Sequence, residues 1–90
     1  MLYMVIEHFR NDDPVPVYKR FRERGRMASD GLTYVTSWVT QDLARSYQVM
    51  ECDDEDLLRE WIGRWQDLVD CEYVPVMTSA EAAARVARES

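Results

Sequence analysis

The ionisable side chain with the most unusual setting in this sequence is Glu7, which interrupts the apolar stretch MLYMVIEHF. A carboxyl group among apolar neighbours loses hydration, which raises its pKa and suits it to acid–base chemistry near neutral pH. The plainer interpretation is a salt bridge or a strand end that faces solvent, and we favour it. His8, the single histidine, is the other candidate for a general base. No serine or cysteine stands beside it as a nucleophile, so a catalytic dyad has weak support.

Three residues are of types that bind zinc, namely His8, Cys52 and Cys71. Their spacing matches no zinc motif and the cysteines form no CxxC pair, so we expect no metal site and no cofactor. We also expect no disulfide. The strands predicted below would hold the two cysteines about 9–10 Å apart, whereas a bridge needs Cα atoms within about 7 Å. Two unpaired cysteines fit a reducing compartment.

Length and charge restrict the class of protein. Ninety residues make one small domain, 1–90, and a content of 47% hydrophobic and 31% charged residues is globular. The net charge of -6 disfavours nonspecific binding to nucleic acid or to anionic membranes. No apolar run could span a bilayer, and the N-terminal stretch has no basic region before it. We therefore expect no signal peptide and a cytoplasmic location.

One basic cluster, Lys19 to Arg26, runs against the overall charge. Nucleic-acid sites of this kind interleave basic and aromatic side chains on one surface. Here the aromatic neighbours, Tyr18 and Phe21, belong to the inner face of the same predicted helix. A solvated helix face is the better interpretation of the cluster.

The strongest pattern lies in residues 53–69, DDEDLLREWIGRWQDLV, which predict a helix. Its apolar residues recur at helical spacing: Leu57, Leu58, Trp61, Ile62, Trp65, Leu68 and Val69. Asp53 or Asp54 is a suitable N-cap, and the acidic run suits the positive end of a helix.

The remaining elements follow from alternation and from helix-capping residues. Strands are predicted over 1–9, 32–40, 46–52 and 71–77, and further helices over 14–27 and 79–88. Pro75 cannot donate to a ladder, which places the last strand at an edge. The order is βαββαβ plus a terminal helix. It predicts an α+β, ferredoxin-like sandwich with strand order 4-1-3-2 and the first two helices on one face.

The other face of the sheet then lacks a cover. We assign an evenly spaced aliphatic set to the helix side: Met4, Ile6, Val35, Val39, Val49, Val74 and Val76. The helix-free face then holds a more aromatic set: Tyr3, Val5, Glu7, Phe9, Tyr34, Thr36, Trp38, Gln48, Met50, Tyr73 and Met77. A shift of one residue would swap Glu7 for His8 and Gln48 for Glu51. Because such a face is too aromatic for water, we expect a homodimer that buries it.

Six segments together carry a resemblance that covers nearly the whole chain: MLYMVIEHF, PVYKRFRERGRM, LTYVTSWV, QVMECDD, WIGRWQDLVD and VPVMTSAEAAARV. The chain resembles the domain of unknown function 3303 family of short bacterial proteins. That resemblance implies a dimeric α/β barrel of ferredoxin-like protomers, but no activity and no catalytic residues. Other dimeric α/β barrels include cofactor-independent monooxygenases, haem-degrading enzymes and ligand-sensing domains. That link is one of fold, which does not fix function.

Two classes of function stay open. One is a small-molecule binding or interaction module without catalysis, which we favour because the sequence shows no catalytic constellation. The alternative is a small cofactor-independent enzyme, of the monooxygenase or isomerase kind, that uses a buried carboxylate or the histidine. A ligand would lie between the helix-free face and its symmetry mate, lined by Tyr34, Trp38, Gln48 and Tyr73, with Glu7 as the charge. The plainer interpretation is that these side chains fill a dimer core.

Overall fold

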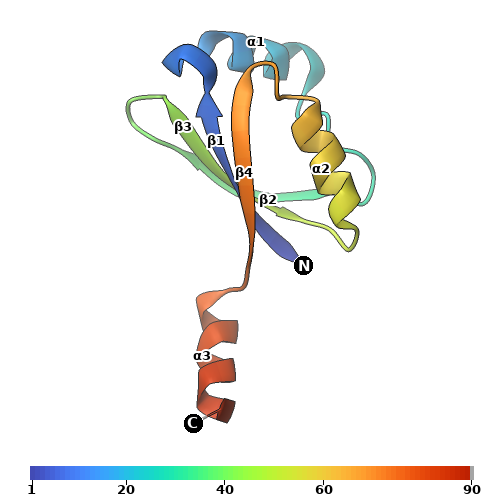
Figure 1. Ribbon diagram of the computed structural model, residues 1–90, viewed down its shortest axis with the longest axis vertical. Helices are drawn as coiled ribbons and strands as arrows, with labels where there is room; N and C mark the ends of the chain where they lie inside the picture. Colours follow the sequence, from blue (N-terminus) through green and yellow to red (C-terminus); the bar gives the residue numbers. More distant parts are fainter. Residues whose placement is uncertain (90) are drawn as a thin grey trace.

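The computed structural model describes residues 1–89 as a four-stranded antiparallel sheet with three α-helices (Figure 1). The elements are β1 (Leu2–Phe9), the short 3-10 helix η1 (Arg10–Asp12), α1 (Val15–Arg24), β2 (Thr33–Val39), β3 (Arg45–Glu51), α2 (Glu55–Gly63), β4 (Val69–Val76) and α3 (Ser79–Glu89). The sheet order β2-β3-β1-β4 confirms the predicted ferredoxin-like topology. Helix α3 extends away from the rest of the fold (Figure 1). None of the helices in residues 1–89 has the length and apolar character that a membrane-spanning helix needs.

The helices begin where the sequence supplies capping side chains. Asp54 Oδ1 accepts a hydrogen bond from the Asp56 N–H at 2.9 Å, which makes Asp54 the N-cap of α2. Thr78 Oγ1 accepts from the Glu81 N–H at 3.1 Å at the start of α3. Both caps satisfy backbone donors that the first helical turn leaves unpaired.

Helix α2 is shorter than the predicted span of 53–69, because it ends at Gly63. The chain then tightens into turns, in which the N–H of Trp65 donates to Ile62 O and that of Leu68 to Trp65 O, both at 3.0 Å. These turns reverse the chain so that β4 can begin at Val69 beside β1. Trp65 nevertheless stays in the core, as its helical spacing predicts.

The faces of the sheet are the main correction to the sequence analysis. Strand β1 turns Tyr3, Val5, Glu7 and Phe9 toward the helices, and all four are buried. The predicted face is therefore wrong for β1, and also for Gln48 and Met50 on β3 and for Tyr73 on β4. The aliphatic residues predicted to face the helices from these three strands lie on the helix-free face instead: Met4, Ile6, Val49, Val74 and Val76. Because β1 is apolar at both parities, alternation alone does not choose its face. The bulkier aromatic set fills the space under two helices.

On strand β2 the residues predicted for one face lie on both faces, because the pairing of β2 with β3 shifts between Tyr34 and Thr36. Tyr34 pairs with the buried Met50 and so lies on the helix side, contrary to the prediction. Thr36 and Trp38 lie on the helix-free face, as predicted. A bulge of this kind changes which side chains face the core.

The helix-free face is largely apolar, although Thr36, His8 and Glu72 also lie on it, and nothing in residues 1–89 covers it. It carries Leu2, Met4, Ile6, Trp38, Tyr47, Val49, Val74 and Val76. Trp38 is 58% exposed there and Val74 is 46% exposed. Large side chains exposed together on one surface are typical of an interaction face.

Candidate functional site

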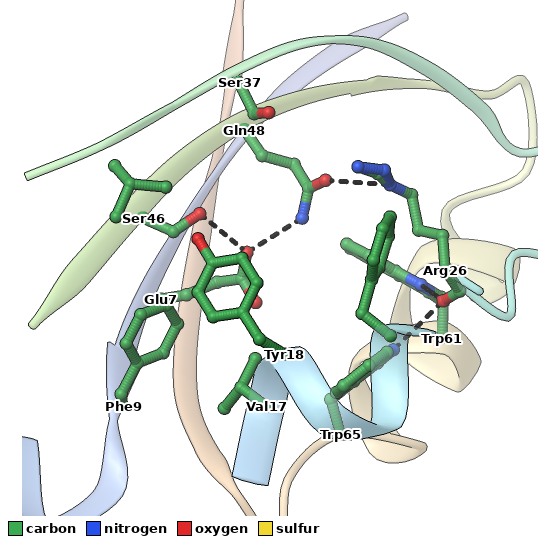
Figure 2. Close-up of a pocket in the computed structure, with 12 residues that line it drawn as sticks. Glu7, Phe9, Val17, Tyr18, Arg26, Ser37, Ser46, Gln48, Trp61 and Trp65 are labelled. Carbon is green, nitrogen blue, oxygen red and sulfur yellow. Dashed lines mark hydrogen bonds between the residues drawn. The ribbon is translucent and has the colours of Figure 1, made fainter. Parts of the chain in front are cut away.

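A cavity of about 230 Å³ lies between α1 and the helix side of the sheet (Figure 2). Its floor is formed by buried side chains from β1, β3 and the α2 region: Glu7, Phe9, Ser46, Gln48, Trp61 and Trp65. Its rim carries exposed apolar side chains, Tyr18 and Phe21 from α1 and Val39 from β2. Seven of its twelve lining residues are aromatic or valine and five are polar or charged, and such a combination of apolar walls with convergent polar groups is common in small-molecule sites.

Helix α1 is anchored through Arg20 to the segment that follows α2. Arg20 forms two hydrogen bonds to the Asp67 carboxylate, at 2.8 and 2.6 Å, and its guanidinium lies over the Trp65 ring. Tyr18 meets Phe9 edge-on, with ring centroids 6.3 Å apart. No α1 side chain, from Val15 to Arg24, is fully buried. The helix therefore forms a roof over the cavity and does not fill it.

Glu7 is the buried charge at the base of the cavity, with only 8% of its surface exposed. The β1–β3 register sets Ser46 directly across from it and Gln48 two residues further on, on the same face. Ser46 Oγ donates to Glu7 Oε1 at 3.1 Å, and Gln48 Nε2 donates to the same oxygen at 2.8 Å. Within residues 1–89, Oε2 accepts no hydrogen bond, so one carboxylate oxygen is left for a molecule in the cavity.

Burial raises the pKa of Glu7 above its ordinary value of 4.5. The hydrogen bond from Ser46, the positive charge of Arg26 and the hydrogen bond from Gln48 act in the opposite direction, and burial outweighs them. Glu7 therefore holds its proton to higher pH than an exposed glutamate. A carboxylate with a raised pKa is a stronger base once it is ionised.

Arg26 supplies the positive charge of the site. Its Nε donates to Gln48 Oε1 at 3.2 Å, so that Gln48 links Arg26 to Glu7 (Figure 2). The guanidinium lies over the Tyr34 ring at 3.7 Å from the centroid and over the Phe21 ring at 5.1 Å. Stacking of this kind fixes the plane of the guanidinium group.

The backbone of Arg26 is also held in place. Its carbonyl oxygen accepts hydrogen bonds from the indole Nε1–H of Trp61 at 2.9 Å and of Trp65 at 3.1 Å. Gly25 ends α1 with a φ of +69°, a conformation that favours glycine, and this turn carries Arg26 out of the helix and over the sheet. The predicted helix to residue 27 is therefore wrong at its end.

Sequence comparison assigns the chain to a family. The model for the family described as Domain of unknown function (DUF3303) matches residues 1–90. The chain belongs to that family. No curated protein matches the chain. Among solved structures, protein Atu4242 from Agrobacterium tumefaciens is similar with 13% sequence identity and a TM-score of 0.51, covering 88% of this chain and 96% of that one. At that identity the likeness shows the fold alone.

The structure distributes the predicted site residues of this DUF3303 chain over several places. Glu7 and Gln48 lie together, but under the helices and not on the helix-free face. Tyr34 does not line the cavity but contacts two residues that do: its ring stacks on the Arg26 guanidinium, and its hydroxyl forms a 2.7 Å hydrogen bond with Ser37 Oγ. Trp38 lies on the opposite face of the sheet. Tyr73, on β4, is absent from the residues that line the cavity.

Tyr73 belongs to a separate polar cluster where β4 lies beside the start of α2. Its hydroxyl donates to Glu55 Oε2 at 3.2 Å and accepts from Arg59 Nε at 3.0 Å. Its ring meets that of Tyr3 edge-on, with centroids 5.8 Å apart. These contacts join α2 to the sheet, which is a structural role.

His8 and Cys71 lie on opposite faces of the sheet. Strand β1 turns His8 to the helix-free side, while the partly buried Cys71 pairs with Glu7 in the β1–β4 register. Burial, followed by the charge of Glu7, raises the pKa of the Cys71 thiol to about 12. Within residues 1–89, no three histidine, cysteine or acidic side chains come together as a metal site.

Arg26, Trp61 and Trp65 were not predicted as cavity residues. The sequence predicted Arg26 as part of a solvated helix face, and Trp61 and Trp65 only as apolar residues of a helix over 53–69. Gly25 was the one available signal for Arg26, because a glycine near the end of a helix often reverses the chain.

Proposed function

We propose that this protein binds a small, largely apolar molecule in the cavity between α1 and the sheet. The observation that carries the proposal is the free Oε2 oxygen of the buried Glu7 carboxylate, at the base of an aromatic-walled space. An apolar cavity of about 150 Å³ is enough to hold benzene. A space of about 230 Å³ therefore suits one ring with a few substituents.

Structural need alone does not account for Glu7. A buried carboxylate costs free energy, and replacing buried charges by apolar side chains of similar volume often stabilises a protein. The raised pKa of Glu7 shows that burial outweighs the groups that favour its ionised form. Features that cost stability in this way are commonly found where a protein acts.

The proposal is tested by thermal shift with a library of single-ring compounds. A compound that binds the folded chain raises its melting temperature by mass action. Ser37→Phe places a ring in the cavity and should remove the shift. Trp38→Leu changes the next residue along β2, on the other face, and should retain it. Shifts that persist in the Ser37 variant and disappear in the Trp38 variant would place the ligand on the helix-free face and contradict the proposal.

A second function is favoured by the same carboxylate. Glu7 could accept or donate a proton at a bound substrate and so act as the base of a small cofactor-independent isomerase. A substrate of that kind would gain deuterium from heavy water at one carbon, in a reaction followed by proton NMR. Exchange in the wild type that Glu7→Gln abolishes would favour the enzyme. Exchange at an equal rate in both proteins would exclude Glu7 as the base.

We also propose that two copies pair through the helix-free face. Its support is the exposed Trp38 and Val74 in an apolar surface that α1 and α2 leave open. Self-complementary faces of this kind are buried by twofold symmetry. Light scattering should give a dimer for the wild type and a monomer for Trp38→Glu. Val15→Glu, which changes an exposed apolar residue of α1, serves as the control and should stay dimeric. A monomeric wild type at micromolar concentration would refute the pairing.

A further inference from the structure

Two side chains of opposite charge line the cavity, and each has hydrogen-bonding atoms that no residue from 1 to 89 satisfies. Glu7 receives its two hydrogen bonds at Oε1, and Oε2 is free within residues 1–89. Arg26 donates from Nε to Gln48, and its two terminal NH2 groups donate no hydrogen bond to any residue from 1 to 89. Both side chains line the cavity (Figure 2). A single ligand could therefore complete both groups.

The side chain of Gln48 sets the separation between the Glu7 carboxylate and the Arg26 guanidinium. The Gln48 amide donates to Glu7 with its nitrogen and accepts from Arg26 with its oxygen, at 2.8 and 3.2 Å. The carboxylate and the guanidinium thus stand on either side of one amide group. Tyr34 and Phe21 hold the guanidinium in plane, which leaves a rigid pair of donors for a planar anion.

We propose, on the basis of the binding function above, that the ligand is a hydroxylated aromatic carboxylate. Its carboxylate accepts hydrogen bonds from the terminal NH2 groups of Arg26. Its hydroxyl donates to Oε2 of Glu7, and its ring lies among the aromatic side chains of the cavity wall. The short span across Gln48 favours substituents on neighbouring or next-neighbouring ring carbons over those on opposite carbons.

Other ligand classes leave one of the two groups unsatisfied. A simple carboxylate or a phosphate would bring negative charge to Arg26 but offer no donor to Glu7, and it would repel that carboxylate. An amine would pair with Glu7 and leave the Arg26 donors unused. A plain hydrocarbon ring would bury both polar groups without partners, which costs free energy. A ring with both a hydroxyl and a carboxylate satisfies the two.

Isothermal titration calorimetry with three probes tests this assignment. The probes are 3-hydroxybenzoate, benzoate, which lacks the donor, and phenol, which lacks the anion. A hydrogen bond to a charged group is worth enough to change affinity by roughly tenfold or more. We expect 3-hydroxybenzoate to bind about tenfold more tightly than either of the other two.

Two variants separate the roles of the charges. Arg26→Gln should remove the advantage of 3-hydroxybenzoate over phenol, and Arg26→Lys should restore part of it. Glu7→Gln should reduce its advantage over benzoate. Arg22→Gln, which removes an exposed arginine of α1 that does not line the cavity, should leave all three affinities unchanged. Circular dichroism confirms that each variant is folded.

The outcomes distinguish the ligand class from the binding function. Equal binding of the three probes, or an advantage that survives both Arg26→Gln and Glu7→Gln, overturns the ligand class. If that binding is lost in Ser37→Phe, the cavity remains the binding site. No heat from any probe at millimolar concentration overturns both proposals for this chemistry.

Discussion

Replacing Gln48 by leucine tests the polar network at the base of the cavity. Gln48 is 5% exposed and joins Glu7 Oε1 to Arg26 Nε, at 2.8 and 3.2 Å. Leucine has a similar volume, so packing is largely kept while both hydrogen bonds are lost. Glu7 then keeps Ser46 as its only donor among residues 1–89.

The expected cost depends on whether Glu7 is ionised. A hydrogen bond to a charged group contributes about 1.5–3 kcal/mol, and the apolar surface of the new leucine offsets part of its loss. We expect Gln48→Leu to lower the free energy of unfolding by about 2 kcal/mol at pH 8, or roughly 10 °C in melting temperature for a domain of this size. At pH 4 Glu7 is protonated, and the cost should fall to about 1 kcal/mol, the value for a neutral hydrogen bond.

The measurement is urea unfolding at both pH values for the wild type, Gln48→Leu, Glu7→Gln and the double variant. In the double variant the charge is gone, so the effect of Gln48→Leu should shrink at pH 8. Gln66→Leu, which changes an exposed glutamine, should cost only a few tenths of a kcal/mol at either pH. A loss that is the same at pH 4 and pH 8 and is unaltered by Glu7→Gln would refute this account of the network.

Three further outcomes follow from the pKa values. Because burial raises the pKa of Glu7, ionising it destabilises the fold as pH rises above 4.5. Glu7→Gln should therefore unfold at higher urea than the wild type at pH 8 and at equal urea near pH 4; a less stable variant at pH 8 would contradict this. Arg20 lowers the pKa of Asp67 to about 2, so their pairing stabilises the fold above pH 4 and is lost as pH falls toward 2. Arg20→Gln should remove that part of the acid sensitivity in urea unfolding, and an unchanged pH profile would contradict it. Burial raises the pKa of Cys71 to about 12 and also raises that of Cys52, so neither thiol should react with a disulfide reagent at pH 8 until the chain unfolds, and rapid reaction of the native protein would be contrary evidence.

The sequence predicted the order of elements because each element carries its own local signal. Asp54 and Thr78 mark helix starts, Pro75 marks an edge strand, and alternating β-branched and aromatic residues mark β2. The face of β1 could not be predicted in this way. Its residues are apolar at both parities, so the helices that pack on it, and not its own pattern, decide which set is buried.

Local signals also decide which residues of the site could be predicted. Glu7 and Gln48 are polar residues in apolar strands, and that setting can be recognised whichever face they occupy. Arg26 could not be recognised, because its position depends on the turn at Gly25 and on two indole groups that hold its carbonyl oxygen. Contacts between distant segments leave no mark in the local pattern of either segment.

The central claim is that the space under α1, and not the helix-free face, receives the ligand. The three tryptophans report on this directly, since Trp61 and Trp65 line the cavity and Trp38 lies on the opposite face. The measurement is a proton–nitrogen correlation NMR spectrum of the indole groups, assigned with Trp38→Phe and recorded during titration with 3-hydroxybenzoate. We expect the Nε1–H signals of Trp61 and Trp65 to move and that of Trp38 to stay. A spectrum in which the Trp38 signal moves alone would place the ligand on the helix-free face and contradict the account.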